Sequence, residues 1–118
     1  LVTNKNSKVD LFLGIGGGPE GVLAAAALKC LGCQMQTRLF FEDSNQKDRA
    51  KKLGLSDLNK KYNINDMVKG DVIFCATGVT DGDLTKGVKD LGNEFEVTTF
   101  ALHKSKKINK IIKNIYNK

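Results

Sequence analysis

The hydrophobic residues of this chain fall into short runs separated by glycine-rich or charged segments. The first run, residues 9–13, is nearly continuous and predicts a strand buried on both faces. It leads into four glycines and the chain's single proline, Pro19, which fits the first turn of a helix. The alanines that follow favour a helix from Pro19 to Gly32. This strand, loop and helix are expected to organise the rest of the domain.

Beyond the helix, the pattern predicts further strands and short helices, and hence an α/β domain. Apolar residues 72–76 predict a strand in the middle of a sheet, and the alternation over residues 96–102 predicts a strand at a sheet edge. The other expected elements are a strand over residues 35–41, a helix over 46–53 after a cap within 42–45, two helical turns capped at Ser56 or Asp57 and at Asn65, and a helix over 84–91.

The glycine loop between the first strand and its helix is the first place to look for chemistry. Glycines can present bare backbone N–H groups to a ligand. Gly16, Gly18 and Gly21 spell G-x-G-x-x-G after an expected strand, and Glu42 stands about where an acidic residue would bind a ribose hydroxyl. A dinucleotide site is therefore one hypothesis.

Glu20, in the first turn of the expected helix, opens two further interpretations. A carboxylate there would repel a pyrophosphate from the positive end of the helix. It would suit a divalent cation shared with a phosphate, because Mg2+ and Mn2+ take carboxylate and phosphate oxygens. It would equally suit a structural role as a complement to the helix dipole. The residues alone leave all three interpretations open.

The net charge of +6 is concentrated at the end of the chain, where residues 104–118 hold six lysines and no acid. The chain is therefore divided into a domain over residues 1–103 and a basic tail over 104–118. A basic tail indicates nucleic-acid binding less strongly than a basic face, and nucleic acid is not an expected partner. No apolar run approaches the roughly 20 residues of a membrane span and no signal peptide precedes the first strand, so the cytoplasm is expected.

Cys30 and Cys33 form a C-x-x-C pair, a spacing that occurs in redox sites. They fall at the expected C-terminal end of the helix, where the dipole disfavours a thiolate. Zinc would need Cys75 and His103 to converge on them, which nothing in the spacing indicates. We expect reduced, structural cysteines, and His103 to be a surface residue at a strand end.

Two motifs, GIGGGPEGVLAAAALKCLG and KGDVIFCATGVTDGDL, occur in this order and resemble the class II fructose-1,6-bisphosphatases. The similarity runs from about Asp10 to Lys106 and covers the C-terminal part of those enzymes. It implies the C-terminal α/β domain of a layered sugar-phosphatase sandwich of the inositol-phosphatase-like superfamily. For the end of the chain it implies a β-hairpin, whereas the helical spacing of its isoleucines favours an amphipathic helix.

The resemblance implies roles for two residues. In the family the glutamate of G-G-x-P-E-G binds a catalytic divalent metal, which here is Glu20 with Mn2+ or Mg2+, and the glycine three residues earlier, Gly17, contacts the sugar phosphate. The implied reaction is the metal-dependent hydrolysis of fructose 1,6-bisphosphate to fructose 6-phosphate and phosphate, in gluconeogenesis. The family's other metal ligands and its catalytic threonine lie upstream, so no catalytic residue is assigned in this segment.

The loop over residues 77–83 is a second candidate wall of the site, because it leaves its strand as the glycine loop leaves the first. Asp81 and Asp83 in it are expected to cap the next helix.

The expected partners are a sugar bisphosphate, the upstream half of the same enzyme and further copies in a homo-oligomer, with no membrane. Two alternatives stay open, a dinucleotide-binding module and a non-catalytic remnant. The remnant stays open because a single metal ligand cannot hold a two-metal site. A sheet that lacks neighbouring strands leaves an unpaired edge, so marginal stability or self-association is expected of the chain alone.

Overall fold

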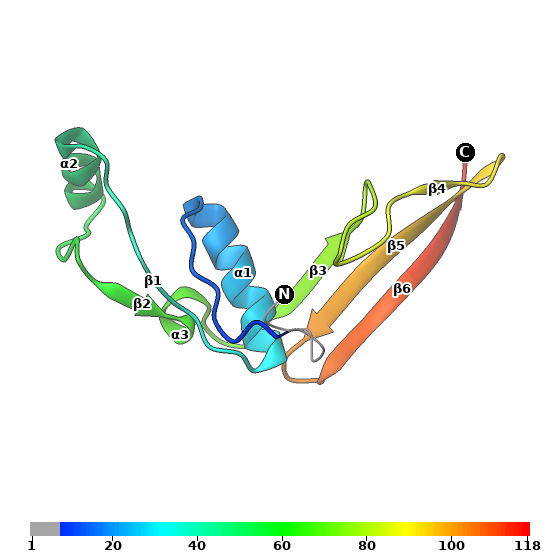
Figure 1. The fold of residues 1–118 in the computed structure, drawn as a ribbon, viewed down its shortest axis with the longest axis horizontal. Coiled ribbons are helices and arrows are strands. Elements are labelled where there is room, and N and C mark those ends of the chain that lie inside the picture. Colours follow the sequence, from blue (N-terminus) through cyan, green and yellow to red (C-terminus); the bar gives the residue numbers. More distant parts are fainter. Residues whose placement is uncertain (1–7) are drawn as a thin grey trace.

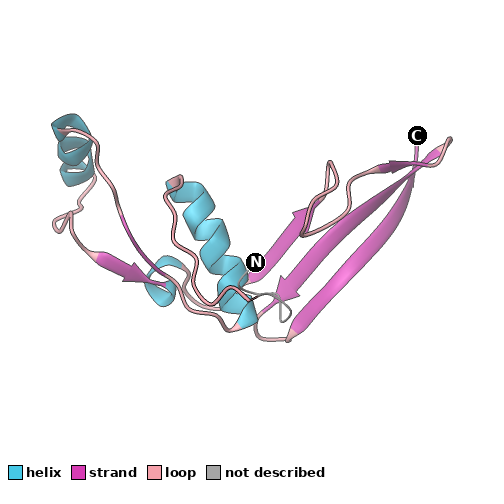
Figure 2. Cartoon of the chain, in the orientation of Figure 1, coloured by secondary structure: helices cyan, strands magenta, loops and turns pink. Residues whose placement is uncertain are grey.

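The computed structural model describes residues 8–118, which form helices and antiparallel sheets (Figures 1 and 2). The elements are, in order, α1 (Gly18–Leu31), β1 (Gln36–Arg38), α2 (Ser44–Lys52), β2 (Lys61–Asn63), α3 (Ile64–Met67), β3 (Ile73–Thr77), β4 (Lys89–Asp90), β5 (Glu94–His103) and β6 (Ile108–Asn117). The expected α/β class is confirmed. Every strand pair among the described residues is antiparallel, however, so the expected arrangement, in which the two candidate loops leave two strands in the same sense, is not found.

Helix α1 forms where the alanine run predicts it. Gly32 ends the helix at a φ of 74°, a left-handed conformation that glycine adopts without a Cβ clash. The C-terminal end of α1 is fixed near the start of β3, because Lys29 Nζ donates to Val68 O over 2.6 Å and Cys30 Sγ to Val72 O over 3.5 Å. From this junction α1 and β3 diverge, as Figure 1 shows.

The strand expected over residues 9–13 is wrong. These residues have no regular secondary structure and are exposed, Leu13 being 82% and Ile15, just beyond it, 87% exposed. A continuous apolar run becomes a buried strand only where neighbouring strands and covering layers enclose it. In this structure β3, the other continuous apolar strand expected from the sequence, pairs with β5.

Around the small sheet β1–β2, the helix caps and the first strand agree only in part with the expected ones. Asp43 caps α2, its Oδ1 accepting from Gln46 N over 2.7 Å, as expected of the cap within residues 42–45. The strand expected over residues 35–41 is only three residues long. The cap expected at Asn65 is wrong, because Asn63 caps α3 and forms a capping box with Asp66.

In the larger sheet β5 lies at the centre. β6 pairs with β5 along its whole length, while β3 and β4 pair with opposite ends of β5 on its other edge. The expectation that β5 is an edge strand is therefore wrong. So is the expectation that β3 lies in the middle of a sheet, because β3 pairs only with β5 among the described strands and its Ile73 is 64% exposed.

The chain ends in a hairpin of β5 and β6, connected through residues 104–107. The hairpin interpretation is confirmed and the amphipathic helix is wrong, because cross-strand pairing with β5 overrides the helical spacing of the isoleucines. In the strand, Ile108 and Ile112 lie on one face and Ile111 and Ile115 on the other. The division at residue 103 stays a prediction, and the hairpin crosses it.

The hydrophobic core is small. Among the described residues, the buried hydrophobic side chains are Ala25, Ala50, Ala101 and Leu102. The accessible surface is 9,336 Å2, whereas a folded monomer of 12.9 kDa exposes roughly 6,300 Å2. The radius of gyration, 17.9 Å, likewise exceeds the roughly 13–14 Å of an independent domain of this length. None of the helices in the described part is long and apolar enough to cross a membrane.

A polar cluster joins the start of β3 to the hairpin turn. The Asp71 carboxylate accepts from Ser105 Oγ over 2.6 Å and from Ser105 N over 3.0 Å, and its Oδ2 lies 2.7 Å from His103 Nε2. The hydrogen bond from Ser105, followed by that from His103, holds the pKa of Asp71 well below its ordinary value. His103 ends β5 as expected, but its side chain is only 14% exposed, so the expectation of a surface residue is wrong.

We expect Asp71→Asn to destabilise the protein in a pH-dependent way. A carboxylate whose pKa is lowered on folding contributes stability above its unfolded pKa, near 3.8, and loses that contribution as the pH falls through the lower folded value. The difference in unfolding free energy between wild type and Asp71→Asn, from urea titrations, should therefore shrink as the pH falls below 3.8. Ser105→Ala, which removes the largest single cause of the lowered pKa of Asp71, should reduce this dependence. A difference in unfolding free energy that does not change with pH would contradict the prediction.

Candidate functional site

The two residues singled out from the sequence lie together at the start of α1. Gly17 is the N-cap residue, without a side-chain cap, and its carbonyl accepts from Gly21 N over 3.0 Å. The Glu20 side chain folds back over Gly17, where a Cβ on that glycine would overlap Glu20 Oε2. The first turn therefore places the Glu20 carboxylate against the backbone of Gly17, which carries no side chain.

This carboxylate lies at the positive end of a fourteen-residue helix, in its exposed first turn. Its oxygens are of the kind that hard divalent cations prefer. Among the described residues no group of three or more His, Cys, Asp or Glu side chains could hold a metal ion. Glu20 can therefore be one ligand of a metal site, and its position fits the dipole interpretation equally well.

The dinucleotide hypothesis lacks its structural setting. A G-x-G-x-x-G loop binds pyrophosphate within a βαβ unit of parallel strands. From residue 8 onward no strand precedes the glycine loop, and β1 pairs antiparallel with β2. Glu42 lies two residues before α2, and its N–H donates to Gln46 Oε1 in that helix over 3.0 Å.

The second candidate loop, residues 78–88 after β3, folds back on itself. Its two halves, residues 78–82 and 85–88, lie against each other and are called its arms. The N–H of Val88 donates to Val79 O over 3.2 Å, and that of Gly82 to Thr85 O over 3.1 Å. Gly78 and Gly87 allow the arms to touch: a Cβ on Gly78 would overlap the Lys86 carbonyl, and one on Gly87 would lie 2.6 Å from the carbonyl carbon of Thr80. No side chain larger than glycine fits either position without moving backbone.

The helix expected over residues 84–91 is wrong, and with it the capping role of Asp81 and Asp83. The Asp81 Oδ1 instead accepts from Gly87 N over 2.9 Å, across the loop. This hydrogen bond, and then the charge of Lys86, lowers the pKa of Asp81. Asp81 therefore holds the two arms of the loop together through this hydrogen bond.

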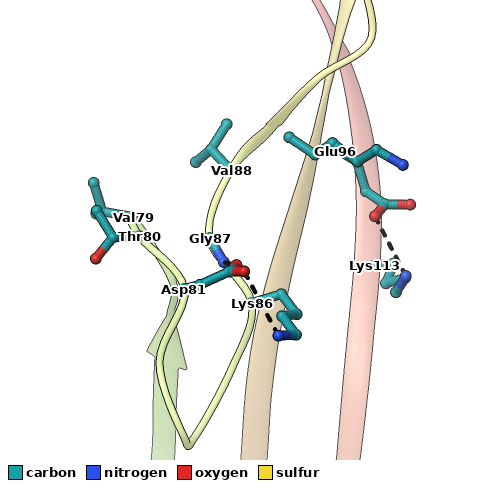
Figure 3. Close-up of a pocket in the computed structure, with 9 residues that line it drawn as sticks. Val79, Thr80, Asp81, Lys86, Gly87, Val88, Glu96 and Lys113 are labelled. Atoms are coloured by element: carbon teal, nitrogen blue, oxygen red, sulfur yellow. Dashed lines mark hydrogen bonds and ion pairs between the residues drawn. The ribbon is translucent and has the colours of Figure 1, made fainter.

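A cleft of about 600 Å3 opens between this loop and the β5–β6 hairpin (Figure 3). Lys86 Nζ lies 3.6 Å from Asp81 Oδ2 on one side, and Lys113 Nζ lies 3.3 Å from Glu96 Oε1 on the other. Both pairs are partly or largely exposed, so each contributes little stability. Sequence reasoning missed this cleft. The opposite charges of Glu96 and Lys113, on the two strands of the hairpin that the family resemblance implies, could have indicated their contact.

The glycine loop and the loop after β3 both lie toward the upper side of Figure 1, at the diverging ends of α1 and β3. The structure thus brings Gly17 and Glu20 together, and places Asp81 and Asp83 in a separate loop.

The three cysteines are free. Burial raises the pKa of the Cys30 thiol, in keeping with a structural role, whereas Cys75 is exposed on β3.

Comparison with known proteins identifies the relatives of this chain. The family model described as bacterial fructose-1,6-bisphosphatase, glpX-encoded, matches residues 1–116. A Haemophilus influenzae protein named fructose-1,6-bisphosphatase class 2 is 39% identical across 90% of this chain and 36% of its own length. A Synechococcus protein named D-fructose 1,6-bisphosphatase class 2/sedoheptulose 1,7-bisphosphatase is 31% identical across 93% of this chain and 35% of its own length.

An Escherichia coli protein named fructose-1,6-bisphosphatase 2 class 2 is 33% identical across 83% of this chain and 35% of its own length. The chain thus spans about a third of the length of the curated relatives that it matches. Since the family model covers nearly every residue, the chain belongs to the glpX-type, class 2 fructose-1,6-bisphosphatase family.

Proposed function

We propose that this chain takes part in the metal-dependent hydrolysis of fructose 1,6-bisphosphate to fructose 6-phosphate and phosphate, a reaction of gluconeogenesis. In this proposal Glu20 binds Mn2+ or Mg2+ and Gly17 faces the sugar phosphate. The upstream part of the enzyme supplies the remaining metal ligands and the catalytic residues. The observation that carries the proposal is the Glu20 carboxylate folded over Gly17 at the start of α1, in a chain of this family.

The metal fits what Glu20 offers, which is one exposed carboxylate with hard oxygen donors. When bound, such an ion supplies positive charge against the phosphoryl group. A site built by this chain alone is not supported, because the described residues form no cluster of three or more ligating side chains.

The start of α1 also contributes backbone N–H groups. The first N–H groups of α1 have no partners inside the helix and attract an anion. Gly17 leaves this surface open, since a Cβ there would occupy the space that the Glu20 carboxylate now fills. A phosphate and a cation can thus share the start of α1, with Glu20 balancing the cation rather than opposing the phosphate.

The large accessible surface of the chain supports a place within a larger assembly. We propose that this assembly is a cytoplasmic homo-oligomer with the layered fold of inositol-phosphatase-like enzymes. The alternative of a dinucleotide-binding module has no observation in its favour here. A non-catalytic remnant would keep the fold and lose metal binding, which the next experiment measures.

We expect Glu20→Gln to weaken Mn2+ binding at least about tenfold, a loss of roughly 1.4 kcal/mol or more, because the substitution removes a charged ligand and keeps its shape. Mn2+ binding is measured by electron paramagnetic resonance, and Mn2+-dependent phosphate release by a colorimetric assay. Both use the chain combined with the upstream part of the enzyme.

Glu42→Gln is the matched control, because Glu42 is also exposed but lies away from the glycine loop, two residues before α2. It should leave both signals unchanged. Undiminished Mn2+ binding in Glu20→Gln would remove Glu20 from the metal site. Absence of Mn2+ binding and of phosphate release in the wild-type combination would favour the remnant.

A further inference from the structure

Strand β6 has a long unpaired edge. All ten of its residues pair in continuous register with β5, and the N–H of Lys118 extends the ladder by donating to Asn93 O over 3.0 Å. Backbone groups of successive residues alternate in direction along an antiparallel pair. Even-numbered residues of β6 therefore direct their N–H and C=O groups toward β5. Odd-numbered residues direct theirs to the other edge, where no strand pairs within the described part of the chain.

This edge carries few of the features that prevent strands from associating. Natural edge strands are usually short, bulged, or blocked by proline and charge. β6 is long, unbulged and free of proline, and its side chains at Ile111, Ile115 and Tyr116 are 52%, 58% and 54% exposed. Lys110 and Lys113 are the charges within the strand, and Lys113 is already paired with Glu96.

Two central registers keep the lysines of β6 apart, one about Ile111 and one about Ile112. The register about Ile111 would pair Ile112 with Lys110 and Ile108 with Asn114, so the register about Ile112 is the better match. If two β6 strands pair antiparallel about Ile112, each Lys110 faces Asn114 of the second copy, and each Lys113 faces Ile111. Centring the pair on Lys110 or on Lys113 would instead place two lysines directly opposite each other, which is destabilising. The odd-numbered Ile111 and Lys113 also have the outward backbone groups that an antiparallel hydrogen-bonded pair needs.

The same register joins apolar side chains across the pair. Ile108, Ile112 and Tyr116 share one face of β6, since side chains alternate along a strand. About Ile112, each Ile108 lies opposite Tyr116 of the second copy and the two Ile112 side chains meet. The chain exposes roughly 3,000 Å2 more surface than a compact monomer of its mass, and a stable interface buries about 1,200–2,000 Å2 in total. The surplus is ample for such an interface.

We propose that β6 is the interface with a second copy of this chain, and that the two β6 strands pair antiparallel about Ile112 into one continuous sheet. The occupant of the free edge is thus another β6. This inference does not rest on the proposed reaction, because none of its residues belongs to the glycine loop.

The first test is the mass of this 118-residue chain in solution, measured by light scattering for wild type and Ile111→Pro. The N–H of Ile111 points to the free edge, and proline is tolerated at such positions, so β5–β6 pairing should survive. The mass should fall from about twice 12.9 kDa to 12.9 kDa, with the circular dichroism spectrum unchanged. A monomeric wild type, or a dimer that survives this substitution, would assign the edge to another occupant, such as the upstream part of the enzyme.

A second test reports the register and needs no unfolding-prone variant. With Cys75→Ser as background, Ile112→Cys should form a disulfide-linked dimer on oxidation, because non-hydrogen-bonded antiparallel pairs bring Cα atoms to about 4.5 Å. Lys110→Cys, the matched control, would face Asn114 and should stay uncrosslinked. Crosslinking at position 110 but not at 112 would overturn the proposed register.

Discussion

Leu102→Ala should lower the free energy of unfolding by about 2–5 kcal/mol, the usual cost of truncating a buried leucine. Leu102 is 1% exposed and is the largest fully buried side chain among the described residues. It lies on the central strand β5, opposite Phe74 of β3 and Asn109 of β6, so its loss opens a cavity where three strands meet. Urea titration followed by circular dichroism measures the change.

The small core makes this loss severe. Folded domains typically have only 5–15 kcal/mol of stability, so the substitution would remove a large share of it. Leu53→Ala is the matched control, because Leu53 is 82% exposed and its truncation should change stability by no more than about 0.5 kcal/mol. Equal losses in the two variants would show that β5 is not the centre of the core.

Elements determined by adjacent residues were predictable from the sequence. The alanines, Pro19 and the left-handed Gly32 define α1 within one residue of its expected start and end. Asp43 likewise fixes the start of α2. Gly17 and Glu20 come together for the same reason, because residues three apart near a helix start are neighbours in space.

Features that depend on distant residues were not predictable. Hydrophobicity alone could not show that residues 9–13 form no strand or that β3 lies at an edge, since both depend on which strands pair alongside. The cleft needs Lys113 of β6 opposite the loop after β3, and the cluster around Asp71 needs His103 from the far end of β5. Each joins residues more than twenty positions apart, and over such distances the hydrophobic pattern does not show which residues lie opposite each other.

The loop after β3 shows how a local signal can mislead. Asp81 and Asp83 precede a segment that could be helical, and aspartate is a preferred helix cap. Instead, Gly78 and Gly87 let the two arms of the loop approach each other directly, and Asp81 bonds across them. Close backbone contact, which the sequence records only as two glycines nine residues apart, outweighs the capping preference.

Gly87→Ala should therefore destabilise the protein by about 1–3 kcal/mol or more, the usual cost of overpacking a closed site. Its Cβ would lie 2.6–2.9 Å from backbone atoms of Thr80 and Asp81, which cannot turn aside as a flexible side chain can. The hydrogen bond from Gly87 N to Asp81 would be displaced as well. Gly82→Ala is the matched control in the same loop, because its Cβ would meet only the Thr85 carbonyl oxygen at 3.9 Å. In urea titrations Gly82→Ala should stay close to wild type, and equal stability of the two variants would show that the arms are not in contact.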